Sequence, residues 1–71
     1  MYDMLVIQFD SREAVLRTAN GAFVRRFASR NGTSIVQASV SNAGDNSMVT
    51  INYANGHADI YHWNGMIYRQ L

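Results

Sequence analysis

Three polar residues near the C-terminal end alternate along one short segment, and they carry groups that acid–base chemistry uses. His57, Asp59 and Tyr61 are spaced two residues apart, which places them on one face of an extended strand. An imidazole beside a carboxylate can act as an acid–base pair or as a weak metal site. The alternative, which we prefer, is a polar edge next to a turn. We therefore expect no catalytic residue, no metal site and no cofactor.

Other signatures of enzymes are absent from the sequence. The 71 residues include no cysteine, which excludes disulfides and thiolate metal sites. There is no glycine-rich phosphate loop, no dinucleotide-binding fingerprint and no HExxH motif. The remaining histidine, His62, is expected on the apolar face of its sheet as a partly buried side chain. The sequence predicts a protein that binds a partner and is not an enzyme.

Two Asn-Gly pairs, at 55–56 and 64–65, indicate how the C-terminal part folds. Asn-Gly is typical of two-residue hairpin turns, because both central residues need a positive φ. Folding about the first pair places Tyr53 opposite Ala58. Folding about the second places Ala58 opposite Leu71 and Ile60 opposite Arg69, which puts this arginine anomalously on the apolar face. The resulting sheet has one apolar face, made of Val49, Ile51, Tyr53, Ala58, Ile60, Ile67 and Leu71.

The opposite face of this predicted sheet gathers methionine and aromatic side chains. Its members are Met48, Tyr61, Trp63, Met66 and Tyr68. Such residues are enriched in protein interfaces, and exposed aromatic rings can also stack on the bases of single-stranded nucleic acid. They can alternatively serve only to stabilise the sheet through cross-strand pairs. We predict a partner-binding surface here, because a monomer rarely exposes a large apolar patch.

Residues 12–29 fit an amphipathic helix. Their apolar members cluster on one helical face: Val15, Leu16, Ala19, Ala22, Phe23 and Phe27. Ser11 suits the N-cap and Asn31-Gly32 suits the C-terminal stop. The alternative is a hairpin about Asn20-Gly21, which places Leu16 opposite Arg25. We prefer the helix because the hairpin pairs apolar residues with arginines.

Five arginines fall between residues 12 and 30, opposed by a single glutamate. They are Arg12, Arg17, Arg25, Arg26 and Arg30. Arginine suits bidentate contact with phosphate or carboxylate groups, so this predicted helix surface is a candidate for binding phosphates or an acidic partner. The alternatives are an ordinary solvated helix face and a codon bias toward arginine.

Two more strands, at 3–9 and 33–41, complete the predicted fold. We expect an α+β fold with one helix packed on a mainly antiparallel sheet of about five strands, in the order β-α-β-β-β-β. The strands at 3–9 and 33–41 could run parallel across the helix. The chain is short enough to be one domain, residues 1–71, with a thin core, so we also expect self-association into a homodimer.

The composition fits a folded protein away from membranes. Hydrophobic residues make up 48% of the chain and charged residues 15%, with a net charge of +1. The longest apolar run, residues 4–7, is far too short to span a membrane, and no secretory signal is visible. We expect a cytoplasmic protein.

The segment 49–71, VTINYANGHADIYHWNGMIYRQL, resembles the closing hairpins of small phage-encoded proteins, including some anti-CRISPR proteins. In some of these a helix likewise precedes the sheet. The resemblance implies a compact viral inhibitor that acts in the host cytoplasm without catalysis. It would block a surface of a large host ribonucleoprotein, typically a type I surveillance complex. Many such proteins are strongly acidic mimics of DNA, whereas this chain is slightly basic.

Two functional hypotheses follow. The first is an inhibitor that binds a larger protein or ribonucleoprotein complex through the aromatic sheet face, the arginine-rich helix or both. The second is a small nucleic-acid-binding protein, in which arginines contact phosphates and aromatic rings stack on bases.

Overall fold

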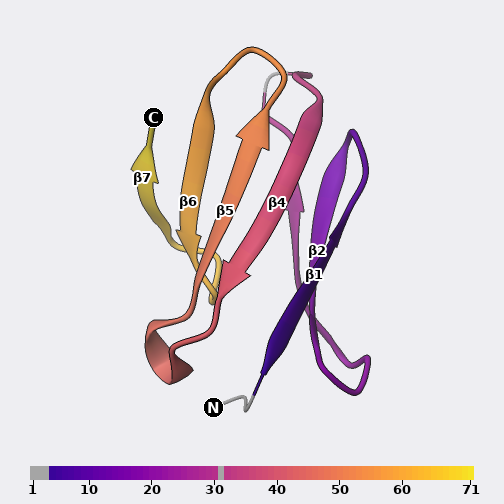
Figure 1. The fold of residues 1–71 in the computed structure, drawn as a ribbon, viewed down its shortest axis with the longest axis vertical. Coiled ribbons are helices and arrows are strands. Elements are labelled where there is room, and N and C mark those ends of the chain that lie inside the picture. The colour runs from indigo at the N-terminus through magenta and orange to yellow at the C-terminus, as the bar shows by residue number, and fades with distance from the viewer. Residues whose placement is uncertain (1–3, 31) are drawn as a thin grey trace.

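The computed structural model describes residues 4–30 and 32–71, which fold as a nearly all-β domain (Figure 1). Its elements are β1 (Leu5–Phe9), β2 (Glu13–Thr18), β3 (Phe23–Ala28), β4 (Ile35–Ser41), the 3-10 turn η1 (Gly44–Asn46), β5 (Met48–Tyr53), β6 (Ala58–His62) and β7 (Ile67–Gln70). They form a three-stranded sheet, β1-β2-β3, and a four-stranded sheet, β4-β5-β6-β7, in which neighbouring strands are antiparallel. The expected α+β fold is wrong, because the described residues contain no α-helix.

The two sheets meet where β1 lies beside β4 (Figure 1). At one end, the Asn42 side chain behaves like a strand peptide: its Oδ1 accepts from Leu5 N at 2.7 Å, and its Nδ2 donates to Leu5 O at 3.1 Å. At the other end, Ile35 N donates to Ser11 O at 3.0 Å. The start of β1 therefore lies at the end of β4, so the strands run in opposite directions and the parallel arrangement considered above is wrong.

The segment predicted as a helix, residues 12–29, is the β2–β3 hairpin. Its loop has three residues, 19–21, and is closed by Thr18 N donating to Ala22 O at 2.9 Å. Gly21 has φ +97°, the left-handed conformation that the last residue of such a loop requires. The Thr18 hydroxyl also accepts from Ala22 N at 3.0 Å. Local turn chemistry therefore outweighs the helical periodicity.

The pairing that argued against this hairpin is present in the structure. Leu16 pairs with Arg25, and a bulge follows at Leu16 and Arg17. Leu16 is fully buried, whereas the Arg25 side chain is exposed and crosses the turn between β6 and β7. A Cβ added at Gly65 would lie 2.7 Å from Arg25 Cδ. The long arginine stem can therefore cover the rim of the core while its charge reaches water.

The two C-terminal hairpins also have loops one residue longer than predicted. Tyr53 N donates to His57 O at 2.9 Å, so residues 54–56 form the first loop. Ile51 consequently pairs with Asp59 and not with Ile60. A one-residue change of register exchanges the two faces of a strand. Asp59 and Tyr61 therefore lie on the face of the core, beside the buried side chains of β5.

The last hairpin combines the predicted register with a bulge. Ile60 pairs with Arg69, as predicted, but the register shifts between Ile60 and Tyr61, and Tyr61 pairs with Ile67. Because β6 is turned over relative to the prediction, Ile60 and Arg69 occupy the outer face. Arg69, which would have been anomalous on the face of the core, is accordingly exposed.

The core lies between the sheets. Its buried hydrophobic cluster consists of Leu5, Ala14, Leu16, Phe27, Ile35, Ala38, Val49, Ile51 and Tyr53. Both sheets contribute, so neither would bury its apolar face alone. Within residues 4–30 and 32–71, no helix has the length and apolar character needed to cross a membrane.

Candidate functional site

A buried carboxylate joins the two sheets. Asp59 on β6 is 0% exposed, and Arg30, which follows β3, reaches it with two guanidinium nitrogens. Nε donates to Oδ2 at 3.1 Å, and Nη2 lies 2.9 Å from Oδ1. That Nη2 contact is an ion pair, and Oδ1 has no hydrogen-bond partner with suitable geometry among the described residues. The pair neutralises a charge that would otherwise be costly to bury.

Two tyrosines complete the surroundings of this carboxylate. The Tyr53 hydroxyl donates to Asp59 Oδ2 at 3.0 Å, and the Tyr61 hydroxyl approaches the same oxygen at 3.4 Å. Burial, followed by the hydrogen bond to Asp59, raises the pKa of Tyr53 to about 12. Burial and the Asp59 charge also raise the pKa of Tyr61. Both phenols therefore stay protonated near neutral pH and act as hydrogen-bond donors.

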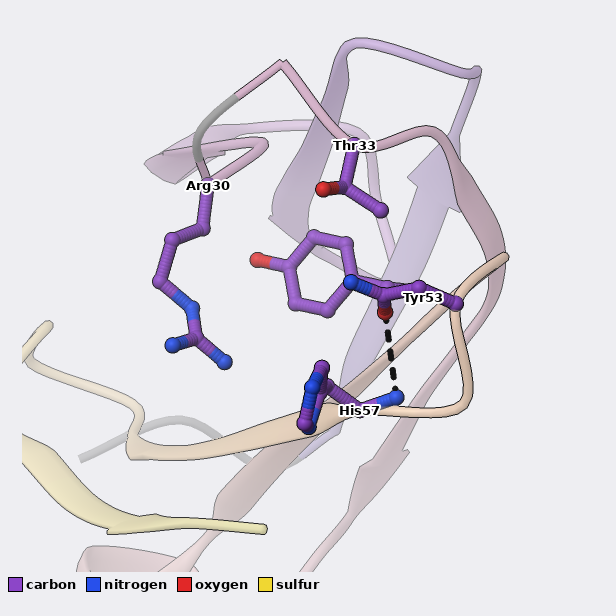
Figure 2. A pocket seen from close by; sticks show the side chains of 5 residues that line it. Arg30, Thr33, Tyr53 and His57 are labelled. Carbon is purple, nitrogen blue, oxygen red and sulfur yellow. Dashed lines mark hydrogen bonds between the residues drawn. The ribbon is translucent and has the colours of Figure 1, made fainter.

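A polar pocket of about 220 Å³ opens in front of this cluster. It is lined by Arg30, Thr33, Tyr53, Asn55 and His57 (Figure 2). The loop after β3 supplies the first two residues, and the β5–β6 hairpin supplies the others. The three-residue hairpin loop thus places an amide and an imidazole opposite a guanidinium. We call this the Arg30 pocket.

The predicted sheet face is not one continuous surface. Tyr61 lies on the face of the core, where its ring centroid is 4.8 Å from that of Phe27. Trp63 packs against the core and donates from Nε1 to Asp45 O at 3.2 Å. Met48 is half-buried on the outer face, opposite His62.

The other two members of that predicted face are open to solvent. Met66 is 64% exposed and Tyr68 is 61% exposed. The Tyr68 ring meets His62 edge-on, with centroids 5.5 Å apart. His62 was expected on the apolar face and is instead on the outer face, because the register of β6 is shifted.

The five arginines predicted on a helix surface are spread over the β2–β3 hairpin and its ends. Arg26 lies 3.5 Å from Glu13, and Arg30 is held by Asp59. Arg17 donates to Gly21 O at 3.2 Å, while Arg25 crosses Gly65 and Arg12 is exposed in the β1–β2 turn. The structure therefore brings no cluster of these five together, and one of them belongs to the Arg30 pocket.

The structure brings together only two of the three alternating polar residues that the sequence singled out. Tyr61 and Asp59 are in contact, whereas His57 lies outside them, where Nδ1 is 3.0 Å from Leu71 O. Within the described part of the chain, no group of three or more histidine or acidic residues is arranged to hold a metal ion.

The sequence contained only a partial signal for the Arg30 pocket. Asp59 and Arg30 are 29 residues apart, and no local pattern links them. A three-residue loop at Asn55-Gly56 would have put Asp59 on the core face and thus raised the question of its partner. No known protein family, curated protein or solved structure matches this chain.

Proposed function

We propose that this chain is a non-catalytic protein-binding domain that adds an extended segment of a larger protein to the free edge of β7. The observation that carries the proposal is the exposure of this strand. β7 is the last strand of its sheet, and all four of its residues are exposed. An uncovered strand edge offers backbone groups for pairing with another chain.

The backbone of β7 presents hydrogen-bonding groups outward. Leu71 exchanges two bonds with Ala58, at 3.2 and 2.7 Å, so its N–H and C=O point toward β6. Because these directions alternate along a strand, Gln70 turns its N–H and C=O away from β6. A partner strand would bond to that edge.

The side chains around this edge suit a protein partner. Tyr68 is 61% exposed, Met66 64%, Leu71 56% and Ile67 47%. Aromatic and methionine side chains supply much of the contact area in protein interfaces. Arg69 is the only charged residue on the strand, so little opposes close approach.

A non-catalytic role is supported by the state of Asp59, the one buried carboxylate in the part of the chain that the structure describes. It is fully buried and surrounded by a guanidinium and two phenols, so it would not reach a substrate. The role that fits this geometry is to hold Arg30 and to join the two sheets.

More specifically, the chain would be an inhibitor that covers a surface of a large host protein or ribonucleoprotein complex. For a phage-encoded chain, that action would take place in the cytoplasm of the host cell. Direct binding of nucleic acid is less well supported. Two of the five arginines face carboxylates, which leaves fewer of them to neutralise phosphates.

The test compares two aromatic residues on opposite edge strands. Tyr68 on β7 and Phe23 on β3 are each 61% exposed, so Tyr68→Lys and Phe23→Lys are matched changes. Tagged wild-type and variant proteins are used to capture partners from lysate of the expressing cell, with quantitative mass spectrometry. A third variant, Gln70→Pro, removes the N–H that points away from β6. We expect one set of partners to be lost with Tyr68→Lys and with Gln70→Pro and to be kept with Phe23→Lys. Equal capture by all variants would contradict the proposal.

A second measurement separates protein from nucleic acid. Labelled single- and double-stranded DNA is titrated at two salt concentrations. We expect that neither DNA binds to the chain in competition with the captured protein. Steeply salt-dependent binding that is unaffected by Tyr68→Lys would overturn the proposal in favour of nucleic acid recognition.

A further inference from the structure

We propose that the Arg30 pocket is a binding site for a small oxyanion, the carboxylate or phosphate group of a small molecule. This inference is independent of partner binding at β7. The pocket volume of about 220 Å³ suits a group of this size with a small attached portion. None of the described residues that line the pocket is acidic.

The guanidinium of Arg30 is fixed in place before any ligand arrives. Its Nε and Nη2 contact Asp59, which is itself fully buried and cannot move away. Among the described residues, Nη1 makes no hydrogen bond, and the guanidinium borders one side of the pocket (Figure 2). An arginine held by a carboxylate on one edge can present its other edge to an oxyanion with little loss of side-chain entropy.

The ring of Tyr53 helps to hold that guanidinium. Arg30 Cζ lies 5.7 Å from the ring centroid, within the range of a cation–π contact. The ring also forms part of the pocket wall (Figure 2). Thus two independent contacts, one ionic and one aromatic, orient the donor that a ligand would meet.

The other walls supply both donors and acceptors. Asn55 Oδ1 accepts from His57 N at 3.1 Å, so the amide group keeps its two Nδ2 donors and one free lone pair on Oδ1. In Figure 2 the Thr33 hydroxyl lies above the Tyr53 ring and the His57 ring lies below it. Because Leu71 O can only accept, the 3.0 Å contact assigns the proton of His57 to Nδ1, so Nε2 is an acceptor that can meet a protonated oxygen of a phosphate group.

The balance of donors over acceptors selects for an anion. Arg30 offers donors only, the Asn55 amide offers two N–H donors against one remaining lone pair, and Thr33 can donate. The charge of Asp59 partly offsets that of Arg30, so we expect half-saturation on the order of 1 mM for a simple anion, as suits a few hydrogen bonds. A larger ligand that carries such a group would bind more tightly by filling the rest of the pocket.

The test is an NMR titration of the whole ¹⁵N-labelled chain at constant ionic strength. Inorganic phosphate and acetate are the two probes, and chloride is the reference salt. We expect saturable shifts of the Thr33, Asn55 and His57 amides with at least one probe, and none with chloride. Saturation by phosphate alone identifies a phosphate site, and saturation by both identifies a general oxyanion site.

The variants are chosen outside the buried ion pair, since removing Arg30 or Asp59 would threaten folding. His57→Ala and Thr33→Val are expected to weaken the phosphate affinity about tenfold and threefold, respectively. His62→Ala, at the other histidine, is the control and is expected to leave the affinity unchanged. Shifts that do not saturate, that spread over the surface arginines, or that saturate with unchanged affinity in His57→Ala would overturn the proposal. Tyr68→Lys is expected to leave anion binding intact, so this site and β7 succeed or fail separately.

Discussion

The edge strands β3 and β7, each at the end of its sheet away from the β1–β4 junction, differ in how they are attached to the rest of the fold. β3 and the loop that follows it reach the four-stranded sheet three times. Arg25 crosses Gly65, the Phe27 ring lies 4.8 Å from that of Tyr61, and Arg30 binds Asp59. Among the described residues, in contrast, β7 pairs with β6 alone and contributes no residue to the buried core.

This difference indicates which edge of a small domain can change its contacts when a partner binds. A chain of 71 residues has few side chains to spare, so an edge that holds the core is not free to change on binding. The edge formed by β3 is committed to the contacts between the sheets. The edge formed by β7 can pair with another chain without disturbing the core.

The largest effect is expected where β3 is tied to β6. Asp59→Asn should lower the free energy of unfolding by about 3–5 kcal/mol, because it leaves the partly buried Arg30 without its charge partner. Urea denaturation followed by Trp63 fluorescence measures the loss. Asp45→Asn, at an exposed aspartate, is the matched control and should change stability by less than about 0.5 kcal/mol. Similar small losses in both variants would show that the ion pair does not hold the sheets together.

Alkaline pH should weaken the same connection. The pKa of Tyr53 is about 12 in the folded chain against 10.0 for a free tyrosine, so the folded state retains the proton more strongly. Its stabilising contribution is complete below pH 10 and is lost as the pH rises toward 12. The expected loss is roughly 2–3 kcal/mol, since the shift is about two pKa units and each unit corresponds to about 1.4 kcal/mol. Tyr53→Phe should be less stable at neutral pH and should show a flatter profile between pH 10 and 12. An unchanged slope in that variant would assign the transition to another group.

The turns of the C-terminal hairpins could be located from the sequence, but their lengths could not. The Asn-Gly pairs at 55–56 and 64–65 do mark turns, as does the pair at 20–21, and Gly21, Gly56 and Gly65 have φ values of 97°, 90° and 95°. In each case the residue before asparagine joins the loop. The same dipeptide suits two-residue loops and three-residue loops that end in a left-handed glycine. That single residue decided which face of β6 enters the core.

The β2–β3 hairpin was missed for a different reason. The spacing of its apolar residues is compatible both with one face of a helix and with the alternation of a strand. The hairpin also required Leu16 to pair with Arg25, which the local pattern disfavours. Local patterns give no information on the turn at Gly65, which receives the arginine stem. The ion pair between Arg30 and Asp59 depends on the same long-range packing, so the Arg30 pocket was beyond sequence reasoning.

A glycine series should sharpen the contrast between the turn that a β3 side chain contacts, at Gly65, and two turns with open space around the glycine. Gly21→Ala and Gly56→Ala should each cost about 1–2 kcal/mol, because alanine disfavours the left-handed conformation although space is available. Gly65→Ala should cost slightly more, since the new Cβ would also displace the Arg25 side chain. Repeating Gly65→Ala in an Arg25→Ala background should remove that excess. If the excess persists without Arg25, the contact between β3 and this turn does not contribute.

The smallest effect is expected at the free edge. Tyr68→Ser should change the free energy of unfolding by less than about 1 kcal/mol, because the side chain is 61% exposed and its described ring contact is with His62 alone. Phe23→Ser, equally exposed on β3, gives the matched reference. Urea denaturation of both variants and amide hydrogen exchange across β7 provide the measurement. We expect the Gln70 amide to exchange rapidly and the Leu71 amide, which donates to Ala58 O at 2.7 Å, to be protected. A loss well above 1 kcal/mol with Tyr68→Ser, or slow exchange at Gln70, would mean that β7 is already engaged within the fold, and the distinction between a committed edge and an available edge would fail.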